Sequence, residues 1–134
     1  MFRRKKSSMR SVIVALTIIV ISVGGSIIYT NHLEDTANEM MLKNNRITIN
    51  ILNEKYNDAE IEIKSLKKFV REKRTVLDAV GNHQELDDIE GELAKLLAFA
   101  HEEDKNQALS KCYMLEFLIE SLPRNFKLKL ENIL

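Results

Sequence analysis

The stretch SVIVALTIIVISVGGSIIY, residues 11–29, decides how the rest of the chain is organised. It contains no charged residue, and its middle consists mainly of Val, Ile, Leu and Ala. As an α-helix that rises about 1.5 Å per residue, this stretch is roughly 28 Å long, which is close to the ~30 Å hydrocarbon core of a bilayer. The sequence therefore predicts one transmembrane helix near the N-terminus.

Charge is distributed unequally on the two sides of this stretch. Residues 1–10 carry five Lys and Arg and no acid, whereas residues 30–134 carry all 20 acids and 15 Lys and Arg, a net charge of −5. Because positive charge is retained on the cytoplasmic side of a membrane, we expect residues 1–10 to form a basic cytoplasmic segment. Residues 11–29 would then cross the cell membrane, and residues 30–134 would form an extracytoplasmic domain.

A basic start followed by an apolar run is also typical of a secretory signal peptide. The run here is longer than the roughly 7–15 apolar residues of a signal peptide, and no Ala-x-Ala cleavage site follows it. Gly24, Gly25 and Ser26 are small enough for a cleavage site, but apolar residues continue beyond them. We therefore expect an uncleaved anchor, and the alternative is a secreted helical protein with a cleaved signal.

The composition after the apolar stretch favours helices over strands. Pro123 is the only proline, and glycine is confined there to Gly81 and Gly91. Apolar residues recur every three or four positions along four segments, as they do on amphipathic helices, although Asn44 interrupts the first. The stripes are Leu33, Ala37, Met40, Ile47 and Ile51; Ala59, Ile63, Leu66, Val70, Leu77 and Val80, widened by Phe69 and Val76; Leu86, Ile89, Leu93, Leu96, Leu97 and Ala100; and Ala108, Cys112, Leu115, Ile119 and Leu122.

Turn-forming residues predict where the first three of these helices end. The first helix should end near residues 53–57, where Asn and Asp cluster, and Asn57 or Asp58 should cap the second. Gly81 suits the left-handed residue that follows a helix, and Asn82 could cap the third helix.

The fourth helix should begin after Asp104 as its cap and end before Pro123. The apolar tail, residues 126–134, fits a short strand-like or irregular cover over the bundle and a last helical turn equally well. Short connections favour antiparallel neighbours. The predicted fold class is therefore all-α: an N-terminal transmembrane helix followed by a small bundle of about four antiparallel helices, arranged as two helical hairpins.

The chain carries no motif of a known catalytic site. No serine has the Gly-x-Ser-x-Gly surroundings of a hydrolase nucleophile, and no Gly-rich phosphate loop is present. The acidic balance of residues 30–134 disfavours binding to a phosphate backbone, so we expect no nucleic-acid partner. The single cysteine, Cys112, cannot form an internal disulfide and stands among apolar residues, as a buried core residue does. We therefore expect no enzyme, no catalytic residue and no cofactor.

The densest polar cluster, residues 83–90, raises the question of a metal site. On a helix His83, Asp87 and Glu90 share one face, which could hold a divalent metal. The usual zinc spacing is absent, because no second His or Cys lies at the matching position. The segment before it is basic, and an antiparallel hairpin would lay opposite charges side by side. We therefore expect a structural role for these three residues and keep a metal site as the alternative.

The C-terminal half resembles a known family. The matching runs are His83-x-Glu85-Leu86-Asp87-Asp88-Ile89-Glu90, Asp104-Lys105-x-x-Ala108-Leu109, Leu115-Glu116-Phe117-Leu118, Leu122-Pro123 and Leu130-Glu131-Asn132-Ile133-Leu134. They are similar to an uncharacterised family of small membrane proteins of Gram-positive bacteria, the domain of unknown function numbered four-three-six-three. The resemblance implies a basic start, one membrane helix and a helical domain of about a hundred residues, and it implies no activity.

These observations lead to an expectation about function. A membrane-anchored helical bundle without catalytic motifs should act by contact, and its partner besides the lipid bilayer should be another membrane protein or a second copy of the chain. Contiguous exposed apolar surface, on a helix face or the tail at residues 126–134, would mark the interface. The alternative is an extracytoplasmic sensor that responds to a metal or a small ligand through residues 83–90.

Overall fold

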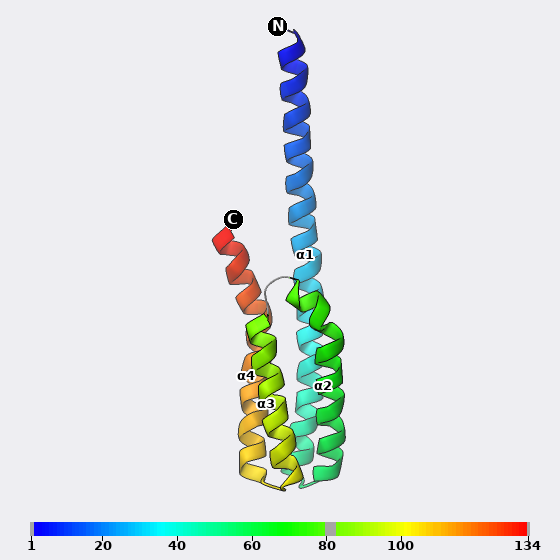
Figure 1. The fold of residues 1–134 in the computed structure, drawn as a ribbon, viewed down its shortest axis with the longest axis vertical. Coiled ribbons are helices and arrows are strands. Elements are labelled where there is room, and N and C mark those ends of the chain that lie inside the picture. Colours follow the sequence, from blue (N-terminus) through cyan, green and yellow to red (C-terminus); the bar gives the residue numbers. More distant parts are fainter. Residues whose placement is uncertain (1, 80–82, 134) are drawn as a thin grey trace. The chain divides into compact units, whose positions relative to one another are not determined.

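A computed structural model describes residues 2–79 and 83–133, and it describes the side chains of residues 7–79 and 83–132. The described residues form helices joined by short turns and contain no strand, which confirms the predicted fold class (Figure 1). The helices are α1 (Phe2–Leu52), α2 (Tyr56–Asp78), α3 (His83–His101) and α4 (Lys105–Ile133).

The chain divides into two units, Met1–His32 and Leu33–Leu134, although α1 is one uninterrupted helix from Phe2 to Leu52. In the first unit, the large apolar side chains from Val12 to Ile28 are each between 46% and 72% exposed. They occur around the whole circumference of the helix, so no protein core covers them. This part of α1 is long and apolar enough to cross a membrane, a property shared by membrane anchors and signal sequences.

The second unit is a bundle whose core consists of one apolar stripe from each helix. Of the stripe residues predicted from the sequence, 20 are buried; they are Leu33, Ala37, Met40, Ile47, Ile51, Ala59, Ile63, Leu66, Val70, Leu77, Leu86, Ile89, Leu93, Leu96, Ala100, Ala108, Cys112, Leu115, Ile119 and Leu122. Phe69 and Leu97 are half-buried at the edges of their stripes. Val76 is 44% exposed, and the prediction that it widens the second stripe is wrong, because its neighbour Leu77 takes the core position.

Neighbouring helices of the bundle are antiparallel (Figure 1), and side-chain contacts join each helix to the next around the core. One contact from each neighbouring pair illustrates this order: Lys43 Nζ with Ser65 Oγ (3.3 Å, α1–α2), His101 Nδ1 with Glu60 Oε1 (3.0 Å, α2–α3), Lys111 Nζ with Glu92 Oε2 (3.1 Å, α3–α4) and Lys127 Nζ with Glu34 Oε1 (2.8 Å, α4–α1). The two hairpins therefore close on each other as a four-helix bundle.

The α1–α2 and α3–α4 turns have the same backbone geometry. Glu54 and Glu103 adopt left-handed φ angles of 58° and 57°. Each turn is closed by a hydrogen bond that spans six residues, from Lys55 N–H to the Asn50 carbonyl (2.8 Å) and from Asp104 N–H to the Phe99 carbonyl (2.9 Å). This is the Schellman motif, in which the left-handed position is usually glycine. A glutamate stands there in both turns.

The start of α2 differs from the prediction. The helix begins at Tyr56 after Lys55, whose side chain makes no capping hydrogen bond, so the expected caps Asn57 and Asp58 lie inside the first turn. The physical reason is that the Schellman turn is already complete at Lys55, which leaves no further loop residues before the helix starts. The first helix nevertheless ends at Leu52, next to the predicted cluster.

The cap of α4 is confirmed, because the Asp104 carboxylate accepts a hydrogen bond from the backbone N–H of Gln107 at 3.2 Å. The predicted turn at Gly81 and Asn82, like the positions of Val80 and Leu134, lies outside the described residues.

The prediction that α4 ends at Pro123 is wrong, because the helix continues through it to Ile133. Proline inside a helix costs about 3 kcal/mol through the lost hydrogen bond and ring clash. Here Leu122 and Phe126 are buried on either side of the proline, at 0% and 6% exposure, and their burial offsets that cost. The tail is therefore helical rather than strand-like.

Candidate functional site: the open pocket and surfaces of the bundle

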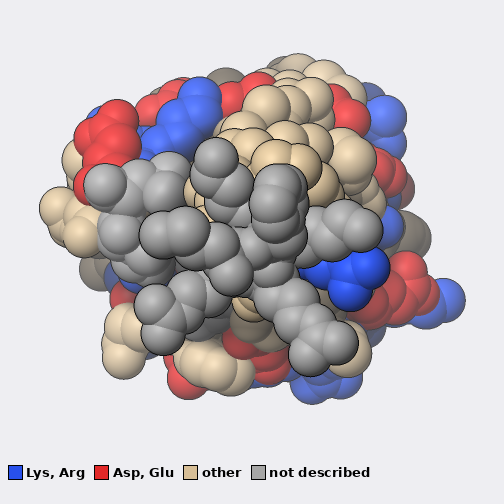
Figure 2. All heavy atoms as spheres, turned by 90° about the horizontal axis from the view of Figure 1, so that it is seen from above, with Lys and Arg blue, Asp and Glu red and all other residues tan. Residues whose placement is uncertain are grey.

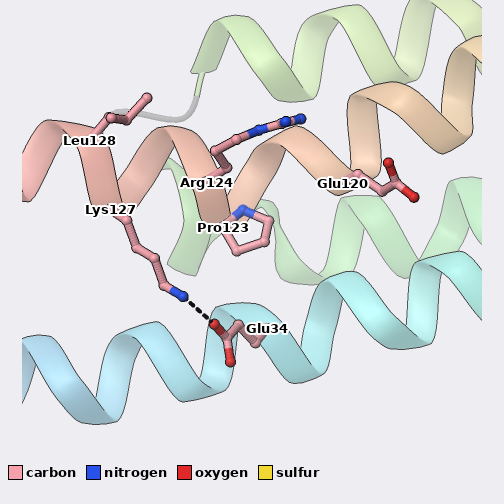
Figure 3. A pocket seen from close by; sticks show the side chains of 6 residues that line it. All are labelled: Glu34, Glu120, Pro123, Arg124, Lys127 and Leu128. Carbon is pink, nitrogen blue, oxygen red and sulfur yellow. Dashed lines mark ion pairs between the residues drawn. The ribbon is translucent and has the colours of Figure 1, made fainter.

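A shallow open pocket of about 430 Å³ lies between α1 and the second half of α4 (Figure 3). Its lining residues are Glu34 from α1 and Glu120, Pro123, Arg124, Lys127 and Leu128 from α4. Pro123, which lies in this lining, has no backbone N–H to donate to the carbonyl one turn earlier in α4.

The charged groups of this pocket are partly engaged with each other. Lys127 extends from α4 to α1, where its Nζ lies 2.8 Å from Glu34 Oε1, and Arg124 points away from α1 (Figure 3). The Lys127 and Glu34 side chains are 55% and 42% exposed, so their ion pair contributes at most about 1 kcal/mol. The lining holds no histidine, thiol or hydroxyl. Its charged side chains can hold a small polar molecule, and the amine of Lys127 is paired with Glu34.

Two of the three predicted metal candidates, Asp87 and Glu90, are held by another cation, the guanidinium of Arg74 on α2. Its Nη1 lies 2.7 Å from Glu90 Oε2, its Nη2 contacts Asp87 Oδ1, and its Nε lies 3.3 Å from Asp78 Oδ2. The hydrogen bond with Asp87, followed by the charges of Glu90 and Asp78, raises the pKa of Arg74 further. His83 Nδ1 contacts Asp78 Oδ1 at 3.1 Å. The structure thus brings Asp87 and Glu90 together, but not with His83.

This arrangement confirms that the α2–α3 hairpin lays opposite charges side by side. Asp87 and Glu90 bind a fixed guanidinium, so a metal ion would have to displace Arg74. Within residues 7–79 and 83–132, no group of three His, Cys, Asp or Glu side chains is arranged to hold a metal ion. Arg74 is the centre of this network, and its place in a basic segment was its one signal in the sequence.

Three polar side chains are buried among the described residues, Thr36, Asn44 and Ser121, and Asn44 is the least exposed of them. Asn44, which interrupts the apolar stripe of α1, is 1% exposed, and its Nδ2 donates a hydrogen bond to the Cys112 carbonyl on α4 at 3.0 Å. Its Oδ1 finds no hydrogen-bond partner among the described residues. Burial raises the pKa of the Cys112 thiol, which is 1% exposed. A buried, protonated thiol is a structural group rather than a nucleophile.

An ion pair of Glu92 also joins α3 to α4. Partial burial by itself raises the pKa of this carboxyl, but hydrogen bonds from Lys95 and Lys111 outweigh it, and the net effect lowers the pKa. Lys111 Nζ lies 3.1 Å from Glu92 Oε2. Viewed from the end of the molecule, exposed acidic and basic side chains likewise lie beside one another (Figure 2).

The outer side of α4 carries exposed apolar residues at helical spacing. Tyr113, Met114 and Phe117 are 57%, 45% and 60% exposed, and Tyr113 and Phe117 stand four residues apart on one side of the helix. We call these three residues the α4 apolar face. Aromatic residues and methionine are enriched in protein–protein interfaces, so this surface is the part of the bundle best suited to bind another protein.

These features define an all-helical protein: a four-helix bundle that follows one apolar N-terminal helical segment. The family model described as Domain of unknown function (DUF4363) matches residues 27–133, and the chain therefore belongs to that family. No curated protein and no solved structure matches the chain. The family's description names no activity.

Proposed function

We propose that this chain is a single-pass, membrane-anchored interaction protein without enzymatic activity, and that it serves as an accessory subunit of another membrane protein. The α4 apolar face carries this proposal. Large apolar side chains on a bundle surface are disfavoured in water, and covering them with a partner removes that cost. The buried, protonated Cys112 thiol and the Arg74-bound carboxylates give no support to a catalytic role.

We propose further that residues 1–10 lie in the cytoplasm and the bundle lies outside it. The five basic residues before the apolar segment support this orientation through the positive-inside rule. Intact-mass measurement of the protein recovered from membranes tests the anchor. A mass that includes residues 1–29 supports it, whereas a mass that lacks them contradicts it and identifies a cleaved signal.

The partner is tested by a photoreactive amino acid placed at Phe117 of the full-length protein in its native membrane. We expect one dominant crosslink, to a membrane protein identified by mass spectrometry. The matched control carries the photoreactive residue at Leu42 on α1, which is 60% exposed, as Phe117 is. Crosslinks of equal yield at both sites, or none at Phe117, would contradict the proposal. A crosslink only to a second copy would replace the accessory role with a homo-oligomer.

A further inference from the structure

The seam between α2 and α3 is formed by two straight rows of side chains. Residues spaced by three or four positions lie on one side of a helix. Ion pairs close both ends of the seam, with Glu60 joined to His101 at 3.0 Å and Arg74 joined to Glu90 at 2.7 Å. Because the helices are antiparallel, these pairs define the register of both rows. The rows are Glu60, Lys64, Lys67, Arg71 and Arg74 on α2, and His101, Leu97, Ala94, Glu90 and Asp87 on α3.

The middle of this seam carries unbalanced positive charge. Between the end pairs, α2 presents Lys64, Lys67 and Arg71, which we call the basic row, and the register places Leu97 and Ala94 opposite its two lysines. None of the three bases forms an ion pair with any residue whose side chain is described. Like charges at these spacings repel each other along a helix. The register also places Glu90 opposite Arg71, but Glu90 is already paired with Arg74, so an acidic partner would relieve the repulsion within the row.

We propose that the basic row binds an acidic helix of a partner protein. Lys64 and Arg71 are exposed and Lys67 is half-buried, so all three charged groups can be reached from outside. Residues 64 and 71 are separated by about 10 Å along the helix axis, at ~1.5 Å per residue. Three carboxylates spaced by three and four residues on another helix have the same separation. The partner chemistry is therefore a helix with acids at positions i, i+4 and i+7, or i, i+3 and i+7.

The surface beside the basic row favours a helix over a flat anionic surface. Gly91, Ala94 and Ala98 of α3 are exposed and have short side chains or none, and a Cβ built on Gly91 would meet nothing within 4 Å. A flat lipid surface would touch only the ends of the long basic side chains. A helix can pair with those ends and also contact the low surface of α3. The positive charge of the basic row is the reason to expect an acidic partner. The short side chains of the neighbouring α3 surface are the reason to expect that this partner is a helix.

This inference deepens the interaction role proposed above and rests on it, but it concerns α2 and α3 rather than the α4 apolar face. The two tests fail independently, because a crosslink at Phe117 does not require the basic row. The probe is a fluorescent helical peptide with Glu at positions i, i+4 and i+7, and its control carries Gln there. Full-length protein in phosphatidylcholine nanodiscs is titrated, and peptide binding is followed by fluorescence anisotropy at low and physiological salt.

We expect the Glu peptide to bind, and added salt to weaken its binding, whereas the Gln peptide should not bind. The variant Lys64→Glu/Lys67→Glu/Arg71→Glu should lose affinity by about tenfold or more, since repulsion replaces attraction. The matched variant Arg46→Glu/Lys55→Glu/Lys105→Glu changes the charge equally at two other exposed bases and one other half-buried base, and should bind within about twofold of the wild type. Circular dichroism checks folding, and the corresponding Gln variant of the basic row is used if charge reversal prevents folding.

Three results would overturn the proposal: no binding of the Glu peptide, equal binding of the Gln peptide, or equal losses in the two triple variants. Vesicles that contain phosphatidylglycerol test the other source of negative charge. If soluble peptide binding is absent and vesicle binding depends on the basic row, the surface recognises lipid and the acidic-helix proposal is wrong.

Discussion

Residues 12–28 and the helices of the bundle both contain many large aliphatic side chains, but they distribute them differently. In residues 12–28 these side chains surround the helix, and each is 46–72% exposed. In the bundle they form one stripe per helix, and nearly all stripe residues are at most 1% exposed. The comparison shows that the spacing of apolar residues along a helix, more than their number, indicates the environment of that helix. A helix that is apolar on all sides requires apolar surroundings, whereas a helix with one apolar stripe buries that stripe against neighbouring helices.

The two regions also differ in the charged residues that they contain. The described side chains from Ser11 to Tyr29 include no charged group, whereas the outer sides of the bundle carry the ion pairs of Arg74 and Glu92. A charge is tolerated on the bundle because water and opposite charges surround it, and neither is available in hydrocarbon. Each region should therefore respond to a different kind of substitution.

The largest expected effect is in the bundle core. Leu115→Ala removes a side chain with 0% exposure and should destabilise the bundle by ~2–5 kcal/mol, from lost burial and the cavity left behind. Thermal unfolding followed by circular dichroism measures this loss, and faster alkylation of the otherwise buried Cys112 reports the same opening. The matched change Leu16→Ala, at a side chain 56% exposed, should leave the bundle transition unchanged. If both variants unfold alike, the division into two environments is wrong.

The next effect concerns the apolar segment. Val20→Arg places a charge in the middle of residues 12–28 and should disfavour membrane insertion by about 2.5–3.5 kcal/mol on the insertion scale. We expect a larger share of the protein to be extracted from membranes at alkaline pH. Leu42→Arg, at a bundle side chain that is 60% exposed, is the matched control and should leave extraction and folding unchanged. Equal extraction of the Val20 variant and the wild type would argue against a membrane anchor.

Most of the bundle could be predicted from the sequence, because the pattern that identifies each helix and its buried side lies within that helix. The 3.6-residue period identifies the buried side of each helix from neighbours on the same helix. Even Asn44, read as an interruption of its stripe, occupies a core position. The errors at Pro123 and at the start of α2 have different causes, the first in packing between helices and the second in local turn geometry. Burial of Leu122 and Phe126 carries α4 past the proline, and the completed Schellman turn starts α2 early.

The candidate sites were less predictable, because they depend on which helices become neighbours. The spacing of Asp87 and Glu90 showed that they share a side of α3, but not that Arg74 of α2 binds both. The α4 apolar face was likewise hidden in the sequence. Helical spacing already places Leu115 on the buried stripe and Phe117 off it, but only the structure shows that Phe117 remains 60% exposed beside the neighbouring helices.

The smallest expected effect is in the turns, which only the bundle has. Glu103→Gly should stabilise the protein by about 0.5–1 kcal/mol, because the left-handed backbone strains a side-chain-bearing residue more than the added chain entropy of glycine costs. The melting temperature should rise by a few degrees, about 4–8 °C per kcal/mol for a domain of up to 100 residues. Glu54→Gly should behave in the same way, since its φ angle is 58°. Glu102→Gly, one residue earlier and without a left-handed φ, is the control and should give no gain. A lower melting temperature for both Glu54→Gly and Glu103→Gly would contradict this prediction. It would show that the glutamate side chains stabilise the turns by more than the left-handed backbone destabilises them.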